Sequence, residues 1–213
     1  MLNSEYLSNL NENQREAVEC LDGPLLIVAG AGSGKTKVLT SRIAHIIKKN
    51  KAFPNQILAV TFTNKAAKEM QLRVSKLLRK DATGLPWLGT FHSISAKLLR
   101  KHADAVGLKS NFSIIDQDDQ VRLIKNICKA ENVDIKKISP KFILAIIDKW
   151  KNKGFYPQDV ILKRKDPLEK NFLSIYKIYQ EKLVNLNSAD FSDLILHTLK
   201  IFEKYTDIAE LYS

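Results

Sequence analysis

The chain has 213 residues, of which 45% are hydrophobic and 27% charged, a composition typical of globular proteins with a substantial core. It contains no run of eighteen apolar residues, its polar start lacks the apolar core of a secretion signal, and Cys20 and Cys128 lack metal-like spacing. These features argue against a membrane-spanning helix and against secretion, and they predict a cytoplasmic protein with two cysteines that are buried or half-buried.

The formal net charge is +11, because 34 lysines and arginines outnumber 23 aspartates and glutamates. Such an excess favours a polyanionic partner such as nucleic acid. The alternative is that lysine simply fills exposed faces without a specific partner. Charge alone leaves both explanations open.

The first 90 residues alternate between amphipathic patterns of period 3.6 and short apolar runs. Each run is followed by a helical pattern, which predicts a parallel sheet covered by helices. The expected elements are a helix from Asn11 to Gly23, a strand over residues 24–30 buried on both faces, a helix from near Gly34, a strand over residues 56–62, a helix behind Thr63 or Asn64, and a strand over residues 87–91.

Beyond Gly107 the patterns become almost entirely helical. We expect a brief extended piece over residues 112–116, followed by helices over residues 116–132, 139–154, 169–186 and 188–205. Ser139 and Ser188 are the expected N-caps of two of these helices. The aromatic residues Phe172, Tyr176 and Tyr179 recur at helical spacing and are expected to lie in the core.

The stretch AGAGSGKT, Ala29 to Thr36, matches the phosphate-loop pattern except that Ala29 replaces its first glycine. Small residues allow backbone N–H groups to converge on phosphates at the positive end of the following helix. Lys35 can neutralise phosphate oxygens, and the Thr36 hydroxyl can bind Mg²⁺. The motif therefore predicts binding of ATP or GTP, with these residues in the site: Ala29, Gly30, Ala31, Gly32, Ser33, Gly34, Lys35, Thr36 and Lys37.

Three stretches around this loop resemble superfamily 1 DNA helicases of the UvrD/Rep/PcrA type. They are LNENQREAV before the loop, AVTFTNKAAKEM after it, and GTFHSISAKLL further along the chain. The resemblance implies ATP and Mg²⁺ as cofactors and implies that Gln14 recognises adenine, since its amide can both donate and accept. A local alternative stays open, because Asn11 and Gln14 also have capping-box spacing.

The same resemblance implies contacts to single-stranded DNA at the carboxyl ends of two parallel strands. Phe62 could stack on a base or pack in the core. His92 could contact a DNA phosphate or base, or it could have a structural role only. The implied contacts are Thr61, Phe62, Thr63, Asn64, Thr90, Phe91, His92 and Ser93. A weaker match, DFSDLI, adds Phe191, while Asp190 and Asp193 are explained by helix-start electrostatics rather than a metal site.

As a whole, the resemblance implies an α/β P-loop NTPase fold with an incomplete RecA-like parallel sheet and an inserted, mostly helical subdomain. Residues 1–90 would form part of the ATP-binding domain and residues 91–213 a subdomain like helicase 1B, with a boundary between residues 90 and 108. The family implies an ATP-driven 3′→5′ helicase that acts on single-stranded DNA and on single-strand/double-strand junctions in repair or replication, at the bacterial nucleoid.

Hydrolysis in that family needs an apolar strand ending in Asp-Glu and arginines from a second RecA-like domain, and neither is present here. We therefore expect an N-terminal portion of a longer helicase that binds ATP weakly and does not hydrolyse it alone. Two alternatives remain: a P-loop nucleoside or nucleotide kinase, and a non-catalytic module that holds nucleotide or DNA.

Overall fold

A computed structural model of the chain describes residues 5–78, 84–135, 137–162 and 167–212. It divides into two compact units, an N-terminal unit over residues 1–94 and a helical unit over residues 95–213. Within the described ranges, no helix combines the length and apolarity that a membrane span requires.

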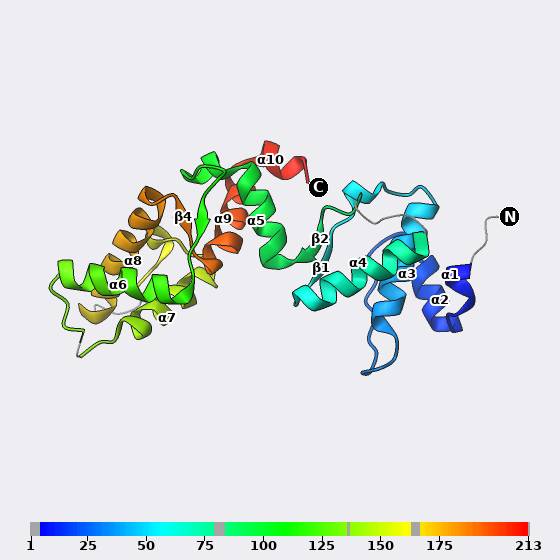
Figure 1. Cartoon of the computed structure of the whole chain (residues 1–213), viewed down its shortest axis with the longest axis horizontal. Helices are drawn as coiled ribbons and strands as arrows, with labels where there is room; N and C mark the ends of the chain where they lie inside the picture. The colour runs from blue at the N-terminus through cyan, green and yellow to red at the C-terminus, as the bar shows by residue number, and fades with distance from the viewer. Residues whose placement is uncertain (1–4, 79–83, 136, 163–166, 213) are drawn as a thin grey trace. The chain divides into compact units, whose positions relative to one another are not determined.

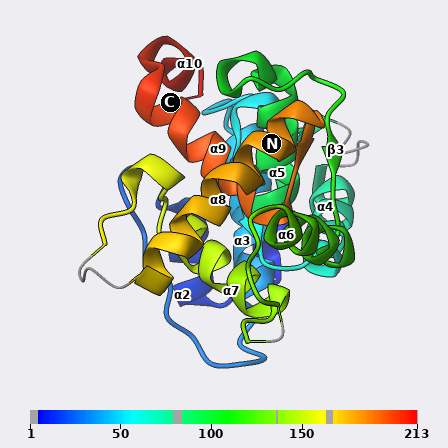
Figure 2. The same ribbon diagram turned by 90° about the vertical axis from the view of Figure 1, so that its left-hand side faces the viewer.

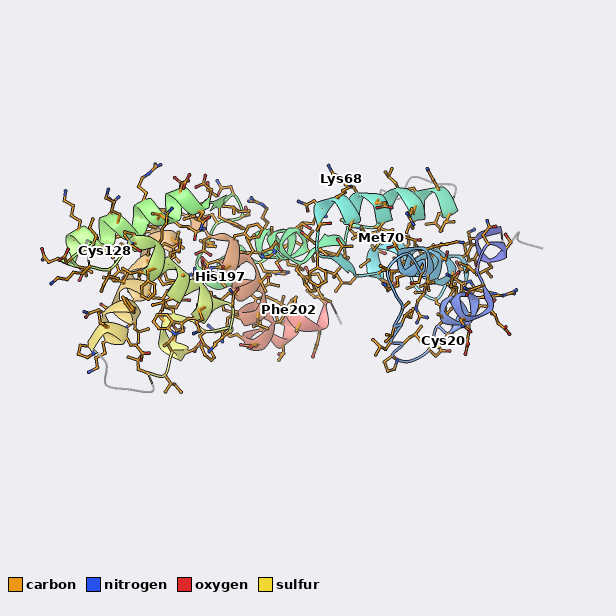
Figure 3. The ribbon with its side chains drawn as sticks, turned by 90° about the horizontal axis from the view of Figure 1, so that it is seen from below. Cys20, Lys68, Met70, Cys128, His197 and Phe202 are labelled. Atoms are coloured by element: carbon orange, nitrogen blue, oxygen red, sulfur yellow. The ribbon has the colours of Figure 1, made fainter. Side chains whose placement is uncertain are left out.

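The N-terminal unit contains a small sheet beside helices (Figure 1). Its strands β1 and β2 run parallel, with Val60 opposite Gly89, which confirms the predicted parallel pairing. Met70 points from α4 toward α3, whereas Lys68 points to the opposite side of α4 (Figure 3). The elements are α1 (Glu5–Ser8), α2 (Glu12–Glu19), α3 (Lys35–Lys48), η1 (Pro54–Gln56), β1 (Ala59–Thr61), α4 (Asn64–Leu78), β2 (Leu88–Thr90) and the start of α5 (Phe91–Lys101).

The strand predicted over residues 24–30 is wrong: this segment has no regular secondary structure and is exposed. Leu26 and Val28 are 86% and 87% exposed, so the apolar run is not buried on either face. A strand requires a neighbour that bonds its backbone N–H and C=O groups. Among the described residues, β1 and β2 bond each other, and neither pairs with this segment.

Two further expectations for the N-terminal unit need correction. The strand predicted over residues 56–62 is shortened to β1, and Phe62 lies outside it with 93% of its surface exposed. Cys20 is exposed rather than half-buried, whereas Cys128 is buried as expected.

The helical unit packs α6, α7 and α8 against one another (Figure 2). Its core includes the predicted aromatic stripe, with Phe172, Tyr176 and Tyr179 buried. The remaining elements are η3 (Ala103–Val106), β3 (Ser113–Ile114), α6 (Gln117–Ala130), α7 (Pro140–Lys151), η4 (Pro157–Asp159), α8 (Pro167–Asn185), β4 (Ser188–Ala189), α9 (Phe191–Lys204) and α10 (Thr206–Glu210).

Helix caps explain where two of these helices begin. Ser139 caps α7 as predicted, because its side chain accepts a hydrogen bond from the N–H of Phe142. The prediction of Ser188 as the cap of α9 is wrong. Ser188 pairs with Ser113 in a short parallel ladder, and Asp190 caps α9 in a capping box with Asp193.

Candidate nucleotide and nucleic-acid site

The glycine-rich loop turns sharply into α3. Gly32 and Gly34 have positive φ angles of 78° and 88°, a left-handed conformation that favours glycine. Gly34 is the N-cap of α3 and provides no capping side chain, so the N–H groups of the first turn remain available to an anion. A Cβ atom at Gly30 or Gly32 would meet no described atom within 4 Å, which places open space beside the loop.

Lys35 stands at the first position of α3, and its side chain is exposed. Its Nζ donates hydrogen bonds to the carbonyl oxygens of Ala29 and Gly30 at 2.5 and 2.6 Å. The ammonium group therefore lies directly at the loop. An arriving phosphate could exchange these neutral acceptors for charged ones, which form stronger hydrogen bonds.

Thr36 and Lys37 complete the predicted loop residues. Thr36 is exposed, and its backbone carbonyl oxygen accepts a hydrogen bond from Thr40 Oγ1 at 2.9 Å. Lys37 Nζ donates to the carbonyl of Asn9 and thereby connects α3 to the segment before α2. The described residues contain no group of three or more His, Cys, Asp or Glu able to hold a metal.

Gln14 forms the capping box with Asn11 that the sequence analysis gave as an alternative to adenine recognition. Its Oε1 accepts from the N–H of Asn11 at 3.2 Å, and Asn11 Oδ1 accepts from the N–H of Gln14 at 2.9 Å, which completes a capping box. Its Nε2 also donates to the Ser33 carbonyl at 2.9 Å, so the amide contacts the phosphate loop. A Cβ at Gly34 would lie 2.9 Å from this nitrogen, which gives Gly34 a second constraint. Contact with adenine stays a prediction.

Two aromatic side chains lie together where β1 and β2 end. Phe62 follows β1 and is 93% exposed, and Phe91 follows β2 and is 51% exposed. Their ring centroids are 6.2 Å apart with an interplanar angle of 56°. Two large exposed rings at one edge of a sheet form a surface on which planar groups can stack. Packing of Phe62 in the core, the alternative weighed from the sequence, is wrong.

Four of the other predicted DNA-contacting side chains form hydrogen bonds within the turns between these strands and the helices that follow. Thr63 Oγ1 accepts from the N–H of Ala66 at 3.1 Å, and Thr61 Oγ1 donates to the Thr63 carbonyl at 3.1 Å. Ser93 Oγ accepts from the N–H of Thr90 at 2.9 Å, and Thr90 Oγ1 accepts from the N–H of Ser93 at 3.2 Å. These hydroxyls therefore shape the two turns, whatever else they contact.

Gly89, in β2, and His92, in the first turn of α5, are neighbours of the second of these turns. A Cβ at Gly89 would come within 2.5 Å of Ser93 Oγ, so a larger residue here would displace the hydroxyl that bonds the N–H of Thr90. His92 is half-buried, and burial lowers the pKa of its imidazole below the ordinary value. Its ring is therefore neutral at pH 7 and could donate a hydrogen bond or stack without contributing a charge. Asn64, the first residue of α4, is exposed.

Phe191 belongs to the helical unit, where it is the first residue of α9 and 55% exposed. The two aspartates that flank it are fully buried. Lys151 Nζ lies 2.5 Å from Asp190 Oδ2 and 2.7 Å from Asp193 Oδ1, and its side chain is also fully buried. The aspartates therefore do more than favour a helix start: they hold a buried ammonium.

The pKa values within this ion cluster follow from its geometry. Burial disfavours the charged form of Lys151, but attraction by both aspartates outweighs burial and raises the pKa of its ammonium. Burial and the neighbouring Asp193 raise the pKa of Asp190. Burial opposes ionisation of Asp193 as well, yet Lys151 and His197 lower its pKa below the ordinary value.

The sequence analysis missed Lys151, although a signal was present. Lys151 continues the spacing of Ile143 and Ile147, two fully buried residues of α7, at intervals of four. A lysine on a buried helical stripe requires a buried anionic partner. The two aspartates of the DFSDLI stretch were the available carboxylates.

Comparison with known proteins identifies the family. Residues 10–213 match the family model described as the UvrD/REP helicase N-terminal domain. The chain is 43% identical over 206 residues to the ATP-dependent DNA helicase PcrA of Staphylococcus epidermidis and 43% identical over 211 residues to that of Bacillus subtilis. It is 46% identical over 215 residues to a probable DNA helicase II homolog of Rickettsia conorii.

These alignments cover 97% to 100% of this chain but only 28% to 32% of each relative. The chain thus spans about a third or less of the length of the relatives it matches. The family match confirms the resemblance that the three sequence stretches indicated, and the chain belongs to the UvrD/REP helicase N-terminal domain family.

Proposed function

We propose that this chain is the N-terminal ATP- and single-stranded-DNA-binding portion of an ATP-dependent 3′→5′ DNA helicase that acts in repair or replication. The exposed Lys35 ammonium at the phosphate loop, beside open space at the start of α3, is the observation that carries the proposal. The names of the relatives, ATP-dependent DNA helicase PcrA and DNA helicase II homolog, support the same activity.

In this proposal the loop residues bind the phosphates of ATP, and the Thr36 hydroxyl contributes to Mg²⁺. The bound nucleotide supplies the energy for movement along DNA. Gln14 recognises adenine, and its hydrogen bond to the Ser33 carbonyl connects the adenine-binding residue to the phosphate loop. Phe62 and Phe91 stack on bases, and Thr61, Thr63, Asn64, Thr90, His92, Ser93 and Phe191 provide further DNA contacts.

The proposal also covers architecture. Residues 1–90 would belong to a RecA-like domain and residues 91–213 to a helical insertion. The remainder of the longer protein would supply the acidic strand and second RecA-like domain. The chain alone would bind ATP weakly without hydrolysing it, and the whole enzyme would work at single-strand/double-strand junctions in the bacterial nucleoid.

Nucleotide binding tests the first half of this proposal. Lys35→Ala should weaken binding of a non-hydrolysable ATP analogue by about 1.5–3 kcal/mol, because a charge-assisted contact to phosphate is lost. Fluorescence titration measures the affinity, and Lys76→Ala, which changes an exposed lysine on α4, is the matched control. Equal affinities for the wild type and Lys35→Ala would refute the nucleotide site.

Stacking on single-stranded DNA tests the second half. Phe62→Ala should weaken binding of an oligothymidine by about 1–3 kcal/mol, the range measured for loss of one base–aromatic stack. Leu72→Ala is the control, since Leu72 is 64% exposed but lies on α4 away from the strand ends. Anisotropy at increasing salt should also show steeply falling affinity. DNA affinity that is insensitive to salt and to Phe62→Ala would count against this surface.

A further inference from the structure

Helix α2, which carries the proposed adenine-binding residue Gln14, has little apolar anchorage of its own. It is eight residues long, and Val18 is the one side chain that it buries. Val18 packs in a small cluster with Leu7 and Val38. A helix of about two turns is only marginally stable by itself. Contacts from outside must therefore fix its place beside α3 (Figure 1).

Arg42 makes such a contact from α3. Its Nη1 donates to the carbonyl oxygen of Ala17 at 2.7 Å and to that of Cys20, at the carboxyl end of α2 that Cys20 marks in Figure 3. The last four carbonyls of a helix lack partners inside the helix, and the helix dipole makes this end attractive to a cation. The last turn of α2 contains no basic residue, so Arg42 supplies the positive charge from the neighbouring helix.

The amino end of α2 is joined to the phosphate loop by Gln14. Its Oε1 accepts from the N–H of Asn11, and its Nε2 donates to the Ser33 carbonyl. Turning the amide over would place donor against donor and acceptor against acceptor, so these two contacts fix its orientation. An amide oxygen can accept two hydrogen bonds, and an amide nitrogen can donate two. Within the described part of the chain each atom uses one, which leaves one acceptor and one donor for a ligand.

This remaining pair of Gln14 matches adenine better than guanine. Adenine presents an N6 donor beside an N7 acceptor, whereas guanine presents acceptors at both O6 and N7. With guanine, Gln14 Oε1 would face a second acceptor and no proton would lie between them. The preference for adenine therefore depends on where α2 holds this amide. Because hydrogen bonds require donor–acceptor distances of about 2.7–3.2 Å, a small displacement of α2 would lose them.

From these contacts we infer that Arg42 is a positioning residue for nucleotide specificity. It holds the carboxyl end of α2 on α3 and thereby keeps Gln14 in place for adenine, so it acts through α2 rather than on the nucleotide itself. The inference rests on the proposed function, which assigns the base to Gln14 and the phosphates to the loop. Loss of the Arg42 contacts should weaken recognition of the base and leave binding of the phosphates unchanged.

Three ligands separate these two parts on the full chain: a non-hydrolysable ATP analogue, the matching GTP analogue, and tripolyphosphate, which has no base. The wild type should bind the ATP analogue about tenfold more tightly than the GTP analogue, as expected for two hydrogen bonds. Arg42→Met should lose most of this preference through weaker binding of the ATP analogue, and it should bind tripolyphosphate as the wild type does. Fluorescence titration measures the two analogues, and displacement of a fluorescent analogue measures tripolyphosphate.

Two further variants serve as controls. Arg73→Met removes an arginine from an exposed ion pair on α4 and should change none of the three affinities. Arg42→Lys keeps a cation that can donate to the same carbonyls, although without the fork of a guanidinium, and should show an intermediate preference for the ATP analogue. Thermal unfolding checks that each variant folds. If Arg42→Met does not fold, a full preference in Arg42→Lys overturns the inference.

The outcomes that contradict the inference differ from those that contradict the nucleotide site. An unchanged ATP preference in Arg42→Met would overturn the inference, and so would equal losses for all three ligands, because a purely structural role lowers them together. Equal binding of the two analogues by the wild type would also overturn it, while a loss of affinity in Lys35→Ala would still support the phosphate site. If Lys35→Ala binds all three ligands as the wild type does, the proposed nucleotide site itself fails.

Discussion

The two units of the chain differ in the size of the side chains that they bury completely. The largest fully buried side chains all belong to the helical unit, among them Tyr176, Tyr179 and Phe112. Both units expose large apolar groups, and in the N-terminal unit several of them, including Leu26, Val28 and Phe62, lie next to loops and strand ends. Binding groups must reach a ligand, so they occupy loops and strand ends that contribute little to the core.

The two units also differ in how deeply they bury an ion pair. The Arg73–Glu69 pair on α4 is roughly half exposed on both sides, and such pairs contribute about 0–1 kcal/mol. The Lys151 cluster of the helical unit is completely buried, so removing one partner leaves uncompensated charge in the interior. The comparison predicts that stability is concentrated in the helical unit, and three experiments test it.

The largest effect is expected for Lys151→Met. It leaves two buried carboxylates without their cation, which should lower the free energy of unfolding of the helical unit by about 3–5 kcal/mol. Urea unfolding followed by Trp150 fluorescence in a Trp87→Phe background reports on this unit. Lys149→Met, which changes an exposed lysine on the same helix, is the control. A loss under about 1 kcal/mol would mean that the cluster adds little to stability.

The next largest effect separates two leucines. Leu183 is 1% exposed in the helical core, and Leu26 is 86% exposed beside the phosphate loop. Leu183→Ala should cost about 2–5 kcal/mol, because it removes buried methyl groups and leaves a cavity. Leu26→Ala should change stability by less than about 0.5 kcal/mol, as expected for an exposed position. Comparable losses in thermal unfolding would show that residues 25–28 are buried in solution.

The smallest effect concerns pH. Burial lowers the pKa of His197 in the folded protein. As the pH falls through the ordinary histidine pKa of about 6.5, the unfolded chain binds a proton here and the folded chain does not. Stability contributed by neutral His197 is therefore present above pH 7 and lost toward pH 5, by at most about 1.4 kcal/mol per pH unit. Unfolding of His197→Gln should depend less on pH across this window, and parallel profiles would contradict the assignment.

Local patterns predicted the helices well because a helix satisfies its backbone within one segment. The apolar spacing of Phe172, Tyr176 and Tyr179 is a property of α8 alone, and so is the cap that Ser139 provides for α7. The capping box of Asn11 and Gln14 is equally local, and it formed as its spacing indicated. The phosphate-loop motif likewise lies directly before a helix, as its chemistry requires.

The strands and the buried ion cluster depended on residues far away in the chain. Leu25–Val28 reads as a buried strand, but a strand needs a neighbour for its backbone groups, and no described segment provides one. Phe62 and Phe91 come together only because β1 and β2 pair in register. Lys151 meets two aspartates about forty positions later, a match that only tertiary packing can decide, because the cost of burying a charge depends on which partners the fold brings to it.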